Sequence, residues 1–140
     1  MEKRVSSRGI IIEGESVYLM HRRKKQNDGA VREYYVIPGG TVEPGEDLLK
    51  ALHREIQEEY GVPVRTIGYL GELENEDAIA YFYKCEIIEG VPVLGGPEKE
   101  VNSEDNFYEI VKLPITVLDN YDVVAKDFIL KAYNNEFIEK

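Results

Sequence analysis

The sequence has a single cysteine and no long apolar segment. Its 140 residues include one cysteine, Cys85, so no disulfide forms within the chain. Cys85 lies in the apolar run AIAYFYKCEI, which predicts a buried strand thiol, since neither His21 nor His53 is near it in sequence. The N-terminus lacks the apolar core of a signal peptide. No run approaches the ~18 apolar residues of a membrane span. These absences predict a cytoplasmic protein with no membrane partner.

Positive charge is also in deficit. The chain has 17 Lys and Arg against 27 Asp and Glu, a formal net charge of −10. A protein that binds a phosphate backbone normally carries a basic face, so DNA is a poor candidate partner. An anionic substrate would need metal ions, or locally placed Arg and Lys, between itself and this protein.

The length and composition predict one domain, spanning residues 1–140, with a sizeable core. Hydrophobic residues make up 43% of the chain. Patterning predicts two strands within 8–23 around a turn at 13–15, and further strands within 34–38, 64–75, 78–88 and 107–113. Helices are predicted at about 46–60, ending at Gly61, and at about 118–134. Residues 24–33, 41–47 and 89–106 read as loops. This order predicts an α/β fold with a mixed sheet flanked by helices.

The first predicted helix carries three carboxylates within five residues, Glu55, Glu58 and Glu59. At about 100° per residue, Glu55 and Glu59 continue the seam of Leu48 and Leu52 instead of lying on the opposite face. Inward carboxylates repel one another and lose hydration. A hard divalent cation with oxygen ligands is the natural compensation.

A glycine pair precedes this helix. Gly39 and Gly40 follow a short strand, and they allow the backbone to approach a ligand closely. A glycine carbonyl is also a suitable ligand for a hard cation. Glu46 stands near the start of the helix, where the dipole favours an acid.

Together these residues carry a resemblance to a known family. The stretch 40–62 resembles the Nudix box, G-x5-E-x7-R-E-U-x-E-E-x-G-U, where U is a bulky apolar residue. Every specified position is satisfied, from Gly40 and Glu46 through Arg54-Glu55-Ile56 and Glu58-Glu59 to Gly61-Val62. The resemblance implies a MutT-like α/β/α sandwich with a central mixed sheet.

The family hydrolyses a nucleoside diphosphate linked to another moiety, with Mg²⁺ or Mn²⁺, by attack of water on phosphorus. The resemblance implies that Glu58 and Glu59 are metal ligands and that Glu55 is another ligand or the general base. It further implies that Gly39 offers its carbonyl to the metal and that Arg54 orients the glutamates. The remaining box residues, Glu46, Gly40 and Gly61, would support the loop and the backbone.

In Nudix enzymes a further acid commonly comes from the loop before a late strand, so the resemblance implies one here. The loop 89–106 offers Glu98, Glu100 and Glu104, and the sequence leaves the choice open. Glu100 and Glu104 stand about as far before the strand as a catalytic acid and a metal ligand would, respectively. Glu98 follows a turn that would direct it inward.

Arg22, Arg32 and Tyr35 are the leading candidate substrate-binding residues. The alternatives of the same kinds are Arg23, Tyr34, Tyr81, Tyr83 and Tyr108. The arginines flank the loop before the glycine pair and are suited to a phosphate, and tyrosine is suited to stacking on a base. The predicted partner is a small nucleotide-diphosphate derivative.

Two alternatives to a small-molecule hydrolase remain. One is a Nudix-fold module that binds a nucleotide without turnover, although its acidic positions would usually be broken. The other is an RNA 5′-pyrophosphohydrolase, for which HRRKK at 21–25 supplies a local basic patch. A homodimer is an implication of the family, not of these residues.

Overall fold

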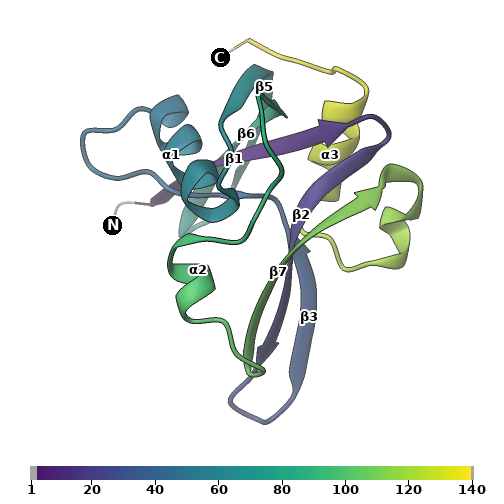
Figure 1. Cartoon of the computed structure of the whole chain (residues 1–140). Coiled ribbons are helices and arrows are strands. Elements are labelled where there is room, and N and C mark those ends of the chain that lie inside the picture. The colour runs from purple at the N-terminus through teal and green to yellow at the C-terminus, as the bar shows by residue number, and fades with distance from the viewer. Residues whose placement is uncertain (1–2, 140) are drawn as a thin grey trace.

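A computed structural model describes residues 3–139. One seven-stranded sheet runs through the molecule, and its strands come from almost the whole chain (Figure 1). The strands are β1 (Arg4–Glu13), β2 (Ser16–Lys25), β3 (Val31–Val36), β4 (Gly39–Thr41), β5 (Val64–Glu74), β6 (Ala78–Ile87) and β7 (Asn106–Pro114). Strands β1 and β6 are parallel and the other pairs are antiparallel, which confirms the predicted mixed sheet.

Strands β1 and β2 diverge, and this divergence positions the candidate site. They pair only next to their connecting turn, from Ile11–Tyr18 to Glu13–Ser16. Farther along, β4 pairs with residues 6–8 of β1, whereas β3 pairs with residues 20–25 of β2. The two strands therefore separate, and each gains a different neighbour on the side where they would otherwise have met.

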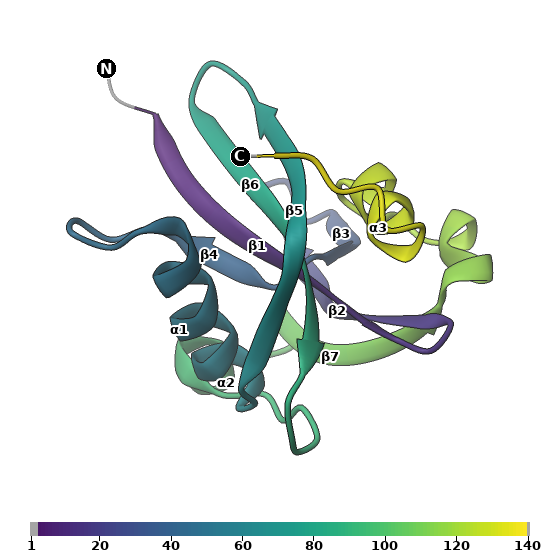
Figure 2. The ribbon, with the colours of Figure 1, turned by 90° about the horizontal axis from the view of Figure 1, so that it is seen from above.

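Helices cover both faces of the sheet, as Figure 2 shows. Helix α1 (Leu48–Tyr60) lies on one face, over a core cluster that includes Ile11, Tyr83 and Cys85. Helix α3 (Lys126–Tyr133) lies on the other face, over a cluster that includes Ile10 and Phe82. Ile10 and Ile11, which are consecutive on β1, thus pack into opposite cores, as the two-residue period of a strand requires. The buried thiol predicted for Cys85 is confirmed.

Helix α1 begins and ends through local chemistry. The Asp47 side chain caps its first turn by accepting a hydrogen bond from the Lys50 amide at 2.8 Å. Gly61 ends it in a left-handed conformation, with φ 68°, and its amide donates to the Gln57 carbonyl. The prediction of a helix that ends at Gly61 is confirmed, and its first residue lies two positions later than predicted.

The prediction of a single helix over 118–134 is wrong. The structure has a 3₁₀ helix, η1 (Ile115–Asn120), and then α3 from Lys126. Between them, the backbone bonds to the edge of β3: the Tyr35 amide donates to Asp122 and the Val124 amide donates to Tyr35, each at 2.9 Å. These bonds to a distant strand outweigh the local amphipathic pattern.

The predicted loop 89–106 also contains structure. A short helix, α2 (Gly96–Glu100), packs beside α1, as Figure 1 shows. The amides of Val93 and Gly95 bond to the carbonyls of Tyr60 and Glu59, each at 2.9 Å. The loop is therefore tied to the end of α1 that carries the glutamates. In residues 3–139, no helix is both long and apolar enough to cross a membrane.

Candidate active site

The glutamates of α1 are divided between the interior and the solvent. Glu59 is 9% exposed and faces the sheet, and Glu55 is half-buried. The Glu58 side chain is 47% exposed. The prediction that the acidic residues continue the inward stripe is therefore confirmed for Glu55 and Glu59, whereas Glu58 is largely exposed.

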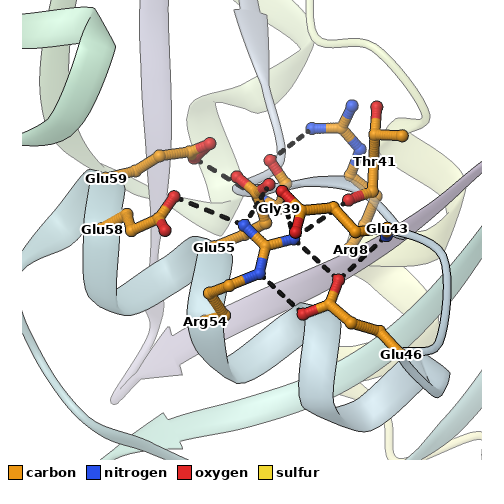
Figure 3. Close-up of polar contacts among 9 residues, drawn as sticks. All are labelled: Arg8, Gly39, Thr41, Glu43, Glu46, Arg54, Glu55, Glu58 and Glu59. Atoms are coloured by element: carbon orange, nitrogen blue, oxygen red, sulfur yellow. Dashed lines mark hydrogen bonds and ion pairs between the residues drawn. The ribbon is translucent and has the colours of Figure 1, made fainter.

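Arg54 organises the outer side of this cluster, and Figure 3 shows it among its partners. It donates to Glu46 at 2.7 and 2.9 Å, to Glu55 at 3.0 Å and to Glu58 at 3.4 Å. It also donates to the Thr41 carbonyl at 3.2 Å. One guanidinium thus bonds to two of the three acids of α1 and joins them to the preceding loop.

Glu46 supports that loop by accepting hydrogen bonds from two directions. Besides Arg54, it accepts from the Glu43 amide at 2.9 Å. The bond from Arg54, followed by that from Glu43, lowers the pKa of Glu46 to about 2. Its carboxylate is therefore an anion at neutral pH and holds the loop to the helix.

The inner acids lie in a field that disfavours their charge. Burial, followed by the charges of Glu98 and Glu55, raises the pKa of Glu59 to about 8. Burial also raises the pKa of Glu55, against the opposing hydrogen bond from Arg54. Carboxylates in such a field bind a cation readily, because the cation removes the repulsion between them.

Glu98, on α2, is a third acid beside the inner pair Glu55 and Glu59. It lines the same cavity as Glu55 and Glu59, and its charge acts on both. One of its carboxylate oxygens, Oε1, is buried and has no hydrogen-bond partner among the described residues. The other two loop acids, Glu100 and Glu104, are exposed and do not line the cavity.

Gly40 provides the space in which Glu55 lies. A side-chain carbon at this position would come within 2.4 Å of the Glu55 carboxyl carbon. Gly39 is buried, and its amide points to Glu59, with an N to Oε1 separation of 3.5 Å. The glycine pair therefore places backbone next to the acidic face of α1.

Arg8 is a residue of this cavity that sequence reasoning missed. It lies in the middle of β1 and donates to the carbonyls of Ile37 and Gly39. A signal existed, because Arg8 occupies the same face of the strand as Ile10, where an apolar residue is expected. A charged residue at such a position requires a partner in the interior.

The cavity itself has a volume of about 910 Å³ and lies where β1 and β2 diverge. One end holds the acids. Toward the β2–β3 hairpin it is lined by Arg22, Lys24, Tyr34 and Tyr108. The cavity is thus acidic at one end, and basic and aromatic at the other.

The predicted substrate residues are placed differently from one another. Arg22 lines the cavity, where it stacks 3.7 Å from the centre of the Tyr108 ring and donates to Asn106 Oδ1 at 2.5 Å. Arg32 lies outside it, toward the hairpin tip and over Tyr34. Tyr35 is 7% exposed and stacks on His21 in the core. Because neighbours on a strand face opposite sides, Tyr34 lines the cavity instead.

The donor set fits a hard cation. Carboxylate oxygens from α1 and α2 and the backbone of Gly39 meet at one cavity, and the unpartnered Glu98 oxygen is a free donor. Within residues 3–139, however, no group of three or more His, Cys, Asp or Glu forms a preformed metal site. A bound cation would therefore have to draw the side chains together.

Comparison with known proteins identifies the class of protein. A model of the NUDIX domain matches residues 3–123. An ADP-ribose pyrophosphatase from Methanocaldococcus jannaschii is 28% identical over 123 residues, which cover 86% of this chain and 70% of that protein. An 8-oxo-dGTP diphosphatase from Buchnera aphidicola subsp. Schizaphis graminum is 34% identical over 76 residues, which cover 54% of this chain and 52% of that protein.

The chain belongs to the Nudix family. It is a Nudix pyrophosphohydrolase, an enzyme that acts on phosphoanhydrides, and members of this family typically depend on a metal ion.

Solved structures share the fold. A MutT NUDIX hydrolase from Burkholderia pseudomallei has a TM-score of 0.72 at 22% identity, over 94% of this chain and 98% of that one. A NUDIX hydrolase from Nitrosomonas europaea has a TM-score of 0.71 at 14% identity, over 100% and 77%.

Proposed function

We propose that this enzyme hydrolyses the diphosphate linkage of a small nucleoside diphosphate derivative, with Mg²⁺ or Mn²⁺ as cofactor. Glu55, Glu58, Glu59 and the Gly39 carbonyl would hold the metal. When bound, the metal neutralises the diphosphate charge and lowers the pKa of a bound water. The observation that carries the proposal is the meeting of Glu55, Glu59 and Glu98, from two helices, at one cavity.

Glu98 is our candidate for the proton acceptor, in preference to Glu100 and Glu104. Its Oε1 has no hydrogen-bond partner among the described residues, so the oxygen is free to accept a proton from water. In Glu55, by contrast, Oε1 already accepts a hydrogen bond from Arg54 and is not free to accept a proton from water. Arg54 then acts by holding Glu55 and Glu58 in place.

The opposite end of the cavity would receive the rest of the substrate. Arg22 is held there by neutral acceptors, the Phe107 carbonyl and Asn106 Oδ1, so its positive charge remains available to a phosphate. Tyr34 and Tyr108 supply aromatic surfaces for a base or sugar. We assign the aromatic role to these two residues and not to the buried Tyr35.

ADP-ribose is the first candidate substrate, because the M. jannaschii relative that acts on it aligns with most of this chain. An oxidised nucleoside triphosphate such as 8-oxo-dGTP is the second, from a match that covers about half of the chain. The basic end of the cavity is compatible with either, and with the 5′ end of a triphosphorylated RNA.

A product-resolved hydrolysis screen tests the proposal. The panel comprises ADP-ribose, nucleotide sugars, dinucleoside polyphosphates, ordinary and oxidised nucleoside triphosphates, and a 5′-triphosphorylated RNA, each with Mg²⁺ or Mn²⁺. The wild type is compared with Glu59→Gln, which keeps the shape of the side chain and removes its charge. Cleavage by the wild type alone supports the proposal. Equal cleavage by both proteins would overturn the role of Glu59, and binding without turnover would favour the nucleotide-binding alternative.

We further propose that residues 1–140 form one Nudix domain that acts in the cytoplasm. The family match over residues 3–123 and the single sheet support this organisation. A homodimer remains a prediction, which size-exclusion chromatography with light scattering tests directly.

A further inference from the structure

Arg8 stands at an unusual position for a cation. It lies in an interior strand, paired with Gly39 of β4 on one side and with Phe82 of β6 on the other. Among the described residues it has no ion-pair partner within 4 Å. Burial accordingly lowers its pKa, and the more distant charges of Glu59 and Glu55 oppose this effect.

Instead of a carboxylate, Arg8 binds the backbone of the glycine loop. Its Nη1 donates to the carbonyls of Ile37 and Gly39, each at 3.2 Å, and Figure 3 shows the bond to Gly39. The amide of Gly9 donates to the intervening Pro38 carbonyl at 2.9 Å. Three successive carbonyls are therefore held by two successive residues of β1.

The backbone of Gly39 links Arg8 to the acidic helix. Its carbonyl accepts from Arg8, and its amide lies 3.5 Å from Glu59 Oε1, so the three groups form a chain across the cavity wall. A carbonyl oxygen has two lone pairs, and the bond from Arg8 uses one of them. The other lone pair remains available to a cation, and the hydrogen bond from Arg8 influences the direction in which the carbonyl points.

We propose that Arg8 is a positioning residue, which orients the Gly39 carbonyl and, through the Gly39 amide, the Glu59 carboxylate for a divalent cation. This inference rests on the proposed metal-dependent function and extends it to a residue outside the box. Groups that orient metal ligands typically contribute about 10–100-fold to metal affinity or activity.

A purely electrostatic role would have the opposite sign. Arg8 is positive and repels a metal ion, so removing its charge should by itself strengthen the binding of that ion at the acidic cluster. Loss of positioning should weaken that binding. The direction of the change in metal affinity therefore decides between the two roles.

The experiment measures Mn²⁺ affinity by electron paramagnetic resonance, at one pH and without substrate, for the wild type, Arg8→Met and Arg8→Lys. Positioning predicts a dissociation constant about 10-fold or more higher for Arg8→Met and an intermediate value for Arg8→Lys, which keeps donors on a shorter side chain. Arg4→Met removes an exposed cation from the same strand and is expected to leave the affinity within about twofold.

Each outcome is decisive. Tighter or unchanged Mn²⁺ binding by both Arg8 variants would overturn the inference, while the proposed function would stand. Absence of Mn²⁺ binding by the wild type, with no effect of Mn²⁺ on hydrolysis, would instead overturn the proposed function, and the inference with it. Circular dichroism and melting temperature report whether Arg8→Met is folded, and if it is not, Arg8→Lys decides alone by the same direction of change.

Discussion

At the scale of single residues, charge and burial separate side chains that look alike in sequence. Glu98 and Glu100 lie two positions apart, yet one lines the cavity and the other is exposed. Arg54 bonds mainly to carboxylates, whereas the hydrogen bonds of Arg8 among the described residues go to backbone carbonyls. The role of a residue in this site therefore follows from what it faces.

We expect Glu98→Gln to lower kcat by about 100-fold or more, since general acid–base groups typically contribute about 10²–10⁴. Glu100→Gln and Glu104→Gln serve as matched variants from the same loop and should lower kcat much less. Steady-state kinetics on the substrate found in the screen, with melting temperatures as a check on folding, provide the measurement. A larger loss for Glu100→Gln would move the proton-accepting role to that residue.

The Glu46–Arg54 pair predicts a pH dependence of stability. The folded-state pKa of Glu46, about 2, lies below its ordinary value of 4.5, so the pair stabilises the fold above pH ~4.5, and this contribution is lost as the pH falls toward 2. Glu46→Gln should therefore lower the melting temperature at pH 7.

The difference in melting temperature between Glu46→Gln and the wild type should shrink steadily from pH 5 to pH 2. Thermal unfolding followed by circular dichroism across this range gives the answer. Glu76→Gln, which changes an exposed acid in the turn between β5 and β6, is a suitable control. A difference that stayed constant down to pH 2 would show that the carboxylate charge is not what stabilises the loop.

At the scale of elements, the site depends on how closely α1 approaches the sheet. A side-chain carbon at Gly9 of β1 would lie 2.7 Å from Ile56 Cδ1 and 2.9 Å from Leu52 Cδ1. The absence of a side chain at Gly9 therefore lets the helix lie directly on β1. Because Glu55 and Glu59 belong to the same helix, this packing also sets their depth in the cavity.

Gly9→Ala should lower the free energy of unfolding by ~1–3 kcal/mol, the usual cost of overpacking a core. The substitution does not strain the backbone, because φ of Gly9 is not positive. Ile56→Val removes the nearer of the two colliding methyl groups, so the double variant should lose less stability than the sum of the two single changes. Urea denaturation of all four proteins tests this coupling, and strict additivity would contradict the proposed clash.

At the scale of the whole molecule, the excess of acids is unevenly distributed around the cavity. The chain carries a net charge of −10, yet the hairpin end of the cavity is basic and the opposite end concentrates acids. A divalent cation at the acids would oppose both burial and the charges of Glu98 and Glu55, which together raise the pKa of Glu59.

Mg²⁺ or Mn²⁺ should therefore raise the melting temperature by binding the folded state alone. At a free concentration of 100 times the dissociation constant, the stabilisation is about 2.7 kcal/mol. Differential scanning fluorimetry with chelator and with increasing metal provides the measurement, and Glu59→Gln should show a smaller shift. No shift for the wild type at millimolar metal would argue that the acidic residues bind a cation only together with substrate.

The sequence by itself determined helix α1, its limits near Asp47 and Gly61, and the inward direction of Glu55 and Glu59, because a helix fixes the relation between residues three and four positions apart. The same local pattern carried the resemblance that the family match then confirmed.

Only the tertiary structure decided which loop acid enters the cavity, that Tyr34 and not Tyr35 lines it, and that Arg8 holds the glycine loop. It also divided the predicted C-terminal helix, through backbone bonds to Tyr35. These outcomes depend on the register between β1 and β4 and on the packing of α2 against α1. Such contacts join residues 30 or more positions apart, as between Arg8 and Gly39, where spacing along the chain no longer determines which side chains meet.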